Sequence, residues 1–418
     1  MKTVLTILIM LITATAWSQS DSLNFLNNAG VQSKSISYER SKEKKLQETT
    51  LPNLEVTAGV FIKPMVLPMG NQVAQFTAMQ MFPWFGTYES IRSEAASMEA
   101  VAYEQFIAER NTVTLQLNVS ILKLYNLKKK KELEEQRLFL LKGIEEYQIT
   151  QYSSAGKRQG PTSSMGMSSA SASGLGMSQL LQTRMEIKAQ QNELLTLEDE
   201  FELERIRFNL VLSRERSAVI ELPDTLLLFT APSITTFENS PMVRMVEAEK
   251  RAAEASEKMA IKMGAPMIGA GLNYMVMQKP SGGDFPMADG NDMIMPMVSL
   301  SLPIYRKRFN SLKKEAQLSQ ASLTKQLEQT KNDLMFAYQE AIQMKKVAER
   351  NLTLAQEQIA LADNTVTLLL SEYTSNQIGY DEVLRMKSQV LMLKIDALDA
   401  LVEYNTAISK LEYILNSY

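Results

Sequence analysis

The chain has 418 residues, with 44 Lys and Arg against 47 Asp and Glu and a formal net charge of −3. That balance lacks the basic excess of a nucleic-acid-binding protein, so no nucleic acid is expected as a partner. Cysteine and histidine are both absent. Their absence excludes disulfides, thiolate and imidazole metal sites, and every catalytic triad that needs either residue.

Residues 1–19 have the pattern of a secretory signal peptide. Lys2 supplies the positive start, Val4–Ala16 is apolar, and Ala16-Trp17-Ser18 fits a cleavage site. The apolar stretch is shorter than the ~20 residues that a membrane-spanning helix needs. No later run is long enough either, so any membrane crossing is expected to use β-strands.

The rest of the chain is read as two repeats, 20–222 and 223–418. In each, two alternating segments of bilayer-crossing length come first, and two long helical stretches follow. The expected strands are 54–62 and 73–81 in the first repeat and 267–278 and 293–302 in the second. The expected helices are 87–155, 178–216, 307–375 and 381–416.

Shared landmarks indicate that these repeats are an internal duplication. Pro83-Trp84-Phe85-Gly86 and Pro303-Ile304-Tyr305-Arg306 close the strand pairs at equivalent places. Gly156 and Asn376 stand where the first long helix of each repeat is expected to end, because both residues tolerate the left-handed conformation of a helix stop. The first repeat also carries an insertion rich in Ser, Gly and Met, 157–177, which predicts a flexible loop at the helical tip.

The helix expected at 307–375 has a seven-residue apolar repeat typical of a coiled coil. A helix of about 100 Å needs continuous lateral partners, and the alanines of this repeat indicate close approach between helices. The repeat consists of Leu327, Leu334, Ala341, Ala348, Ala355, Ala362 and Leu369.

Even-numbered positions of the four strands are mostly apolar, among them Val56, Phe76, Leu272 and Val298, which suits one face to lipid and the other to a lumen. The turn-rich segments Lys63–Asn71 and Lys279–Asn291 are expected to be the exposed loops. Four strands cannot close, because their open edges would leave backbone groups unpaired in hydrocarbon. Three copies supply twelve strands, so the chain is expected to be a homotrimer in the outer membrane.

This organisation resembles the TolC-type outer-membrane factor (outer membrane efflux protein) family over nearly the whole mature chain. The resemblance rests on Phe82–Gly86, Leu302–Tyr305, the segment Glu372–Leu384 and Glu238–Met242, which is similar to the family's Asn-x-Pro before a helix. The methionines, taken up below, make the heavy-metal (copper/silver) efflux branch the candidate subgroup. The fold implied is mainly α with a small β part. Long antiparallel helical hairpins form an α-barrel when trimeric, and four strands contribute to a 12-stranded trimeric β-barrel.

The resemblance implies contacts with a periplasmic adaptor protein and an inner-membrane efflux pump at the helical tip, with outer membrane lipid around the strands. Asp381 and Glu382 are candidates for a closing carboxylate ring, although Arg385 departs from the family's pattern. The partner-binding tip residues are Gly156, Ser178, Leu181, Asn376, Tyr380, Asp381, Glu382 and Leu384.

Methionine is unusually frequent, with 26 residues. Seven fall on the odd-numbered strand positions assigned to the lumen: Met79, Met81, Met275, Met277, Met293, Met295 and Met297. Thioether sulfur is a soft ligand suited to Cu(I) and Ag(I), so a series of weak sites could conduct such ions. Methionine also serves as a flexible apolar filler, and that reading stays open.

The leading hypothesis is a passive exit duct for a pump, with no cofactor and no catalysis, conducting Cu(I) or Ag(I). A general drug or solute efflux channel is the alternative. An exported structural coiled-coil protein is the second alternative. An enzyme is the least favoured class, because no nucleophile–base or metal constellation is visible in the sequence.

Overall fold

The computed structural model describes residues 27–48, 50–67, 70–157, 170–230, 239–279, 290–375 and 378–415. The expected signal peptide, residues 158–169 of the tip insertion, and Asn376 lie outside these ranges. The chain is mostly helical with one four-stranded antiparallel sheet, as predicted. Within the described ranges, no helix is long and apolar enough to cross a membrane.

The elements follow the predicted order of strand pair and helix pair in each half, with one further helix before each pair of strands. They are α2 (Ala29–Glu48), β1 (Glu55–Leu67), β2 (Gly70–Pro83), α3 (Thr87–Lys157), α4 (Ala170–Val211), α5 (Pro241–Met263), β3 (Met267–Gln278), β4 (Met293–Ser301), α6 (Lys307–Thr374) and α7 (Tyr380–Leu415).

The chain divides into two compact units, here called the strand unit and the helical unit. The strand unit comprises 33–108 and 241–331, and so contains the sheet, α5, most of α2 and the first parts of α3 and α6. The helical unit comprises 1–32, 109–240 and 332–418, and so contains α4, α7 and the remainders of α3 and α6.

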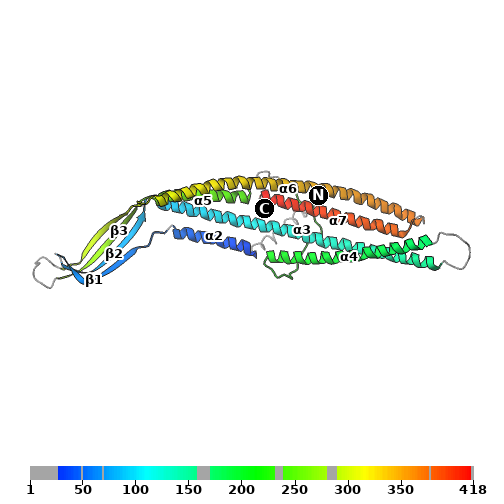
Figure 1. The fold of residues 1–418 in the computed structure, drawn as a ribbon, viewed down its shortest axis with the longest axis horizontal. Helices are drawn as coiled ribbons and strands as arrows, with labels where there is room; N and C mark the ends of the chain where they lie inside the picture. Colours follow the sequence, from blue (N-terminus) through cyan, green and yellow to red (C-terminus); the bar gives the residue numbers. More distant parts are fainter. Residues whose placement is uncertain are drawn as a thin grey trace, which may run out of the picture. The chain divides into compact units, whose positions relative to one another are not determined.

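The sheet of the strand unit has the order β1-β2-β3-β4, with every neighbouring pair antiparallel (Figure 1). The pairing of β2 with β3 joins the two halves of the sequence, whereas the other two pairs are local. Register shifts occur between Val60 and Met65 in β1 and between Gln72 and Ala74 in β2. Within this chain, β1 and β4 are therefore the edge strands.

Helix α5 follows the Asn239-Ser240-Pro241 sequence, which suits a helix start because proline at the first helical position loses no needed N–H donor. Its apolar residues lie on one side, and small side chains dominate the buried set: Val243, Val246, Ala248, Ala252, Ala253, Ala255 and Ala260. Arg244 pairs with Glu104 of α3 at 3.0 Å. Helix α5 therefore packs closely against α3 within the strand unit.

In the helical unit, α3 and α4 form an antiparallel hairpin that α7 also contacts. Leu141 and Ile144 of α3, Ile187 of α4 and Leu384 of α7 form one buried cluster. A second cluster joins Leu122 and Tyr125 of α3 to Val402 of α7. Polar bonds reinforce the hairpin, for example from Gln190 to the buried carboxylate of Glu134 at 2.6 Å.

Most of the apolar repeat of α6 is buried where it lies in the helical unit. Leu334, Ala341, Ala348, Ala355 and Ala362 are all buried, whereas Leu327 and Leu369 are half-buried. Contacts from this stretch to α7 include Met344 Sδ with Lys410 Nζ at 3.8 Å and Lys345 over the Tyr404 ring at 5.7 Å. The small alanine side chains let α6 and α7 approach closely.

Two boundaries in the first strand pair, the end of β1 and the start of β2, differ from the sequence expectation by three residues or more. The Lys63-Pro64 turn signal was wrong, since β1 continues through Pro64 to Leu67 and β2 already begins at Gly70. An edge strand can accept proline, because the missing N–H costs nothing where no neighbour pairs with it. The connection is thus shorter than expected, and Gly70 with a positive φ begins β2.

Helix α4 differs from its expected range at both ends. It begins at Ala170, inside the segment read as a loop, because alanine, leucine and methionine there offset the helix-weakening serine and glycine. It ends at Val211 instead of 216, because Ser213 adopts a left-handed conformation with φ 54°. The Asn209 side chain then donates to the carbonyl oxygens of Arg216 and Ala218, which fixes the departing chain.

Candidate functional site

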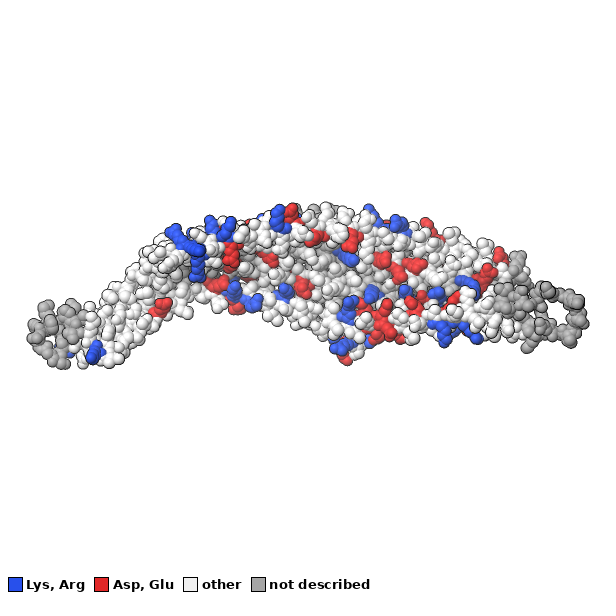
Figure 2. All heavy atoms as spheres, in the orientation of Figure 1, with Lys and Arg blue, Asp and Glu red and all other residues white. Residues whose placement is uncertain are grey.

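The two faces of the sheet differ sharply in chemistry. Strand registers pair even-numbered residues with even-numbered ones, such as Val56 with Ala78 and Leu272 with Pro296. The even-numbered face carries no charged residue, and its side chains are largely exposed, with Val298 at 84%. Figure 2 shows few charged side chains over the strands, in contrast to the helices, where both signs are dense. This face is an extended uncharged apolar surface.

All seven predicted strand methionines share the opposite face, here called the methionine face. The registers align Met79 with Gly271 and Met297, and Gln75 with Met275 and Met293. Beyond the β2 register shift, Gln72 pairs with Met277, so Met277 keeps the same side. Polar residues that share the face with the seven methionines include Glu55, Thr57, Gln72, Gln75, Thr77, Asn273, Ser299 and Ser301. Polar groups and thioethers are therefore interleaved.

Two of these methionines are held by direct contacts. The Ser299 hydroxyl lies 3.4 Å from Met79 Sδ and 3.6 Å from Met81 Sδ, close enough to donate a hydrogen bond to sulfur. Sequence reasoning missed Ser299 and the neighbouring Gly269 and Gly271. The available signal was the alternation of Gly269 and Gly271 along the β3 face that also carries the methionines.

The far end of the methionine face is fixed by Asp292. Its carboxylate accepts a hydrogen bond from the backbone N–H of Met277 at 2.9 Å and another from the Tyr274 hydroxyl. Met277 is correspondingly buried, at 6% exposure. The other described methionines of the face are half-buried or exposed.

The predicted tip residues fall near the ends of four helices in the helical unit. Gly156 lies in the last turn of α3, whose end is Lys157. Ser178 and Leu181 lie in about the third and fourth turns of α4, which begins at Ala170, and both are exposed. Asn376, outside the described residues, has no structural account, and α6 ends at Thr374.

Helix α7 begins at Tyr380, so Asp381 and Glu382 occupy its first turn. Carboxylates are favourable there because the free N–H groups of a helix start carry partial positive charge. Tyr380 packs against Tyr373 and Tyr147, with ring centroids 5.1 and 6.3 Å apart. These rings tie the end of α6 to α3 and α7.

The tip residues differ in what they offer to a partner. Leu384 is buried in the cluster with Leu141 and Ile144, so its side chain packs the core instead of presenting a surface. Glu382 is exposed, whereas Asp381 and Tyr380 are half-buried.

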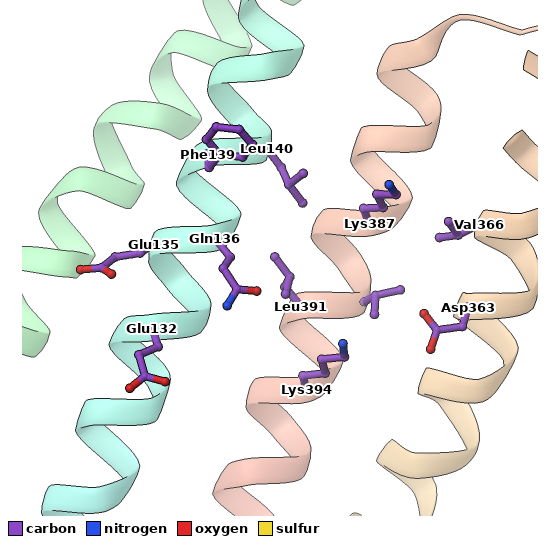
Figure 3. A pocket seen from close by; sticks show the side chains of 11 residues that line it. Glu132, Glu135, Gln136, Phe139, Leu140, Asp363, Val366, Lys387, Leu391 and Lys394 are labelled. Atoms are coloured by element: carbon purple, nitrogen blue, oxygen red, sulfur yellow. The ribbon is translucent and has the colours of Figure 1, made fainter. Parts of the chain in front are cut away.

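A groove of about 720 Å³ lies between α3, α6 and α7 in the helical unit. Leu391 of α7 and Gln136 and Leu140 of α3 line its middle, and Lys387, Lys394 and Asp363 lie on the α7 and α6 side (Figure 3). Phe139 at its margin is 77% exposed. Across the described residues, no three Asp or Glu side chains group closely enough to hold a metal ion. The lining of the groove thus combines an apolar strip, which includes Leu140 and Leu391, with charged side chains at its margins, such as Glu132, Lys387 and Asp363.

Comparison with known proteins gives a fold match. No protein-family model and no curated protein sequence matches the chain. Among solved structures, the outer membrane protein VceC from Vibrio cholerae has a TM-score of 0.72 at 14% identity, covering 94% of each chain. The Campylobacter jejuni CmeC outer membrane channel has a TM-score of 0.71 at 13% identity, covering 94% of this chain and 84% of CmeC. The CusC channel has a TM-score of 0.67 at 14% identity, covering 94% and 90%. The chain therefore has the fold of outer membrane channels.

Proposed function

We propose that this chain is one subunit of a homotrimeric outer-membrane exit duct of the TolC-type outer-membrane factor family. The observation that carries the proposal is the sheet: one face is mostly apolar and uncharged, the other interleaves polar groups with thioethers, and no segment that the structure describes pairs with the outer edge of β1 or β4. Lipid is the environment that such an exposed apolar face suits. The likeness in fold to outer membrane channels supports the same assignment.

Trimerisation follows from the edges of the sheet. Unpaired backbone groups on β1 and β4 would each cost several kcal/mol in hydrocarbon. Pairing β1 of one copy with β4 of the next, around a threefold axis, removes both edges and closes twelve strands. The helices then form the periplasmic tube. Its tip, with exposed Ser178, Leu181 and Glu382, meets the adaptor, and an inner-membrane pump supplies the substrate.

Disulfide crosslinking tests this closure, because the native chain has no cysteine to interfere. Thr57→Cys on β1 is combined in turn with Met295→Cys, Met297→Cys and Ser299→Cys on β4, and each variant is oxidised in membranes. One register is expected to give dimers and trimers and nothing larger. The control, Thr77→Cys on the central strand β2 with the same partners, is expected to give no crosslink between copies. A ladder beyond three, or no crosslink in any register, contradicts the closed trimer.

For the substrate we propose Cu(I) or Ag(I), with general drug or solute efflux as the alternative. Support comes from the placement of seven methionines on the face that carries more of the polar side chains, including the charged Glu55, whereas the opposite face is mostly apolar. Apolar filling does not by itself favour that face over the apolar one. Soft thioethers would bind these ions weakly enough to pass them on.

The substrate proposal is tested in cells. Replacing Met293, Met295 and Met297 together by leucine keeps side-chain volume and removes sulfur. We expect lower copper and silver tolerance with unchanged dye export. Loss of both together would indicate a damaged duct, and unchanged metal tolerance would favour the general efflux channel. A protein released as a soluble, elongated molecule would instead favour the exported structural alternative.

A further inference from the structure

Two glycines of β3 open a gap in the methionine face. Gly269 stands between Met81 on β2 and Ser299 on β4, and Gly271 stands between Met79 and Met297. At both of these positions across the sheet, β3 contributes no side chain, because the residue is glycine. The side chains on either flank can therefore lie over β3 and meet each other.

The contacts show that they do meet. Strands β2 and β4 are second neighbours, about 10 Å apart in a sheet of ordinary spacing. The Ser299 hydroxyl nevertheless lies within 3.6 Å of both Met79 Sδ and Met81 Sδ. A Cβ added at Gly269 would overlap the Ser299 hydroxyl and come within 2.6 Å of Met81 Sδ. Glycine is thus required for two sulfurs and one oxygen to share this space.

The donors in the gap select a particular kind of ion. Thioethers bind soft metals, whereas Mg²⁺ and Ca²⁺ prefer several hard oxygen ligands. Two sulfurs with one weak oxygen suit a soft monovalent cation that accepts few ligands. Glu55 lies opposite Met79 in the β1–β2 register and adds a negative charge to the same row. Its charge favours a cation over a neutral ligand.

We propose that Met79 and Met81, gathered over Gly269 by Ser299, form a discrete binding site for Cu(I) or Ag(I). This site makes the proposed substrate more specific. Its role in transport rests on the proposed function, whereas its ability to bind a metal ion does not. The proposal assigns tight binding to this single site, which the fold forms, and not equally to all methionines of the face. When the ion binds, both sulfur atoms contact the ion, and the hydrogen bond from the Ser299 hydroxyl to sulfur is lost.

Titration of Ag(I) into the purified, detergent-solubilised full mature protein, in chloride-free buffer, tests the site by calorimetry. We expect one tight Ag(I) per chain. Met79→Leu with Met81→Leu is expected to weaken it by about 100-fold or more, since even residues behind the ligands change metal affinity 10- to 100-fold. Met185→Leu with Met335→Leu removes two exposed thioethers of helices α4 and α6, outside the methionine face, and is the matched control, with affinity expected to stay unchanged.

Gly269→Ala tests whether tight Ag(I) binding needs the gap over Gly269 or only the number of thioethers. It keeps every methionine but fills the gap, so it should also lose the tight Ag(I). Circular dichroism and the assembly size of each variant establish that it folds. Equal weakening in both leucine pairs, or full binding by a folded Gly269→Ala protein, overturns the proposal. If binding behaves as expected but copper and silver tolerance in cells does not change, the site stands and the proposed substrate fails.

Discussion

At the residue scale, the helical unit depends on a few buried polar groups that find partners. Glu134 is buried, and its carboxylate accepts a hydrogen bond from Gln190 and lies 3.4 Å from Arg137. A buried carboxylate without donors is costly, because burial removes the water that would otherwise stabilise its charge. The contact between α3 and α4 therefore depends on single buried residues such as Glu134 and Gln190.

Replacing Gln190 by leucine is therefore expected to destabilise the hairpin. Glu134 would lose its 2.6 Å donor, at a cost of about 1–3 kcal/mol. The measurement is the midpoint of thermal unfolding in detergent. Gln182→Leu, at an exposed position of the same helix, is the control. Equal midpoints for the two variants would show that the buried bond contributes little.

Glu412 gives a pH-dependent prediction. Burial raises the pKa of its carboxyl group above the ordinary glutamate value. The folded state therefore holds this proton at higher pH than the unfolded chain does. The charged group then lowers stability at neutral pH, and that penalty disappears as the pH falls through the raised pKa.

Glu412→Gln should consequently raise the free energy of unfolding at pH 7, because it removes a charge that burial disfavours. The gain should shrink towards zero once the pH falls below the ordinary glutamate range, where the wild-type carboxyl is neutral in both states. Unfolding midpoints measured from about pH 3 to pH 8 check this, because the lower limit lies below the ordinary glutamate pKa. A gain that is constant with pH would show that the charge is not its cause.

At the scale of elements, close helix packing depends on the alanine repeat of α6. Ala348 is fully buried, and the contacts of its neighbours Met344 and Lys345 place this stretch against α7. A larger side chain would force the two helices apart. The seven-residue repeat visible in the sequence thus has a direct structural counterpart.

Ala348→Leu is expected to cost about 1–3 kcal/mol, the usual penalty for overpacking. Ala360→Leu, at an exposed position of the same helix, should be nearly neutral, because leucine is also a good helix former. Thermal unfolding of the two variants side by side gives the comparison. If Ala348→Leu proves no worse than Ala360→Leu, α6 and α7 are not closely packed there.

The elements also show what the sequence could and could not predict. Strands β3 and β4 and the starts of α3 and α6 followed from period-two alternation and from the Pro83 and Pro303 landmarks. Helix α2 was missed because it is polar all round, with Val31 its one buried residue, so it shows no apolar stripe. The gap at Gly269 could not be predicted, because it depends on the register between β2, β3 and β4, which alternation alone does not fix.

At the scale of the whole molecule, the account rests on assembly. A single copy leaves two strand edges free, which is costly in lipid, and an uncharged apolar face exposed, which is costly in water. In the proposed trimer, three copies would resolve both problems at once, with lipid against the apolar face and the methionine face turned to the lumen. Substrate conduction, partner docking and metal binding by the gap over Gly269 would then occur in threefold copies.

Native mass spectrometry of the protein extracted from outer membranes in mild detergent tests this claim most directly. The account predicts an assembly of three mature chains that requires detergent to stay in solution. A single chain or a dimer that is soluble without detergent would contradict it.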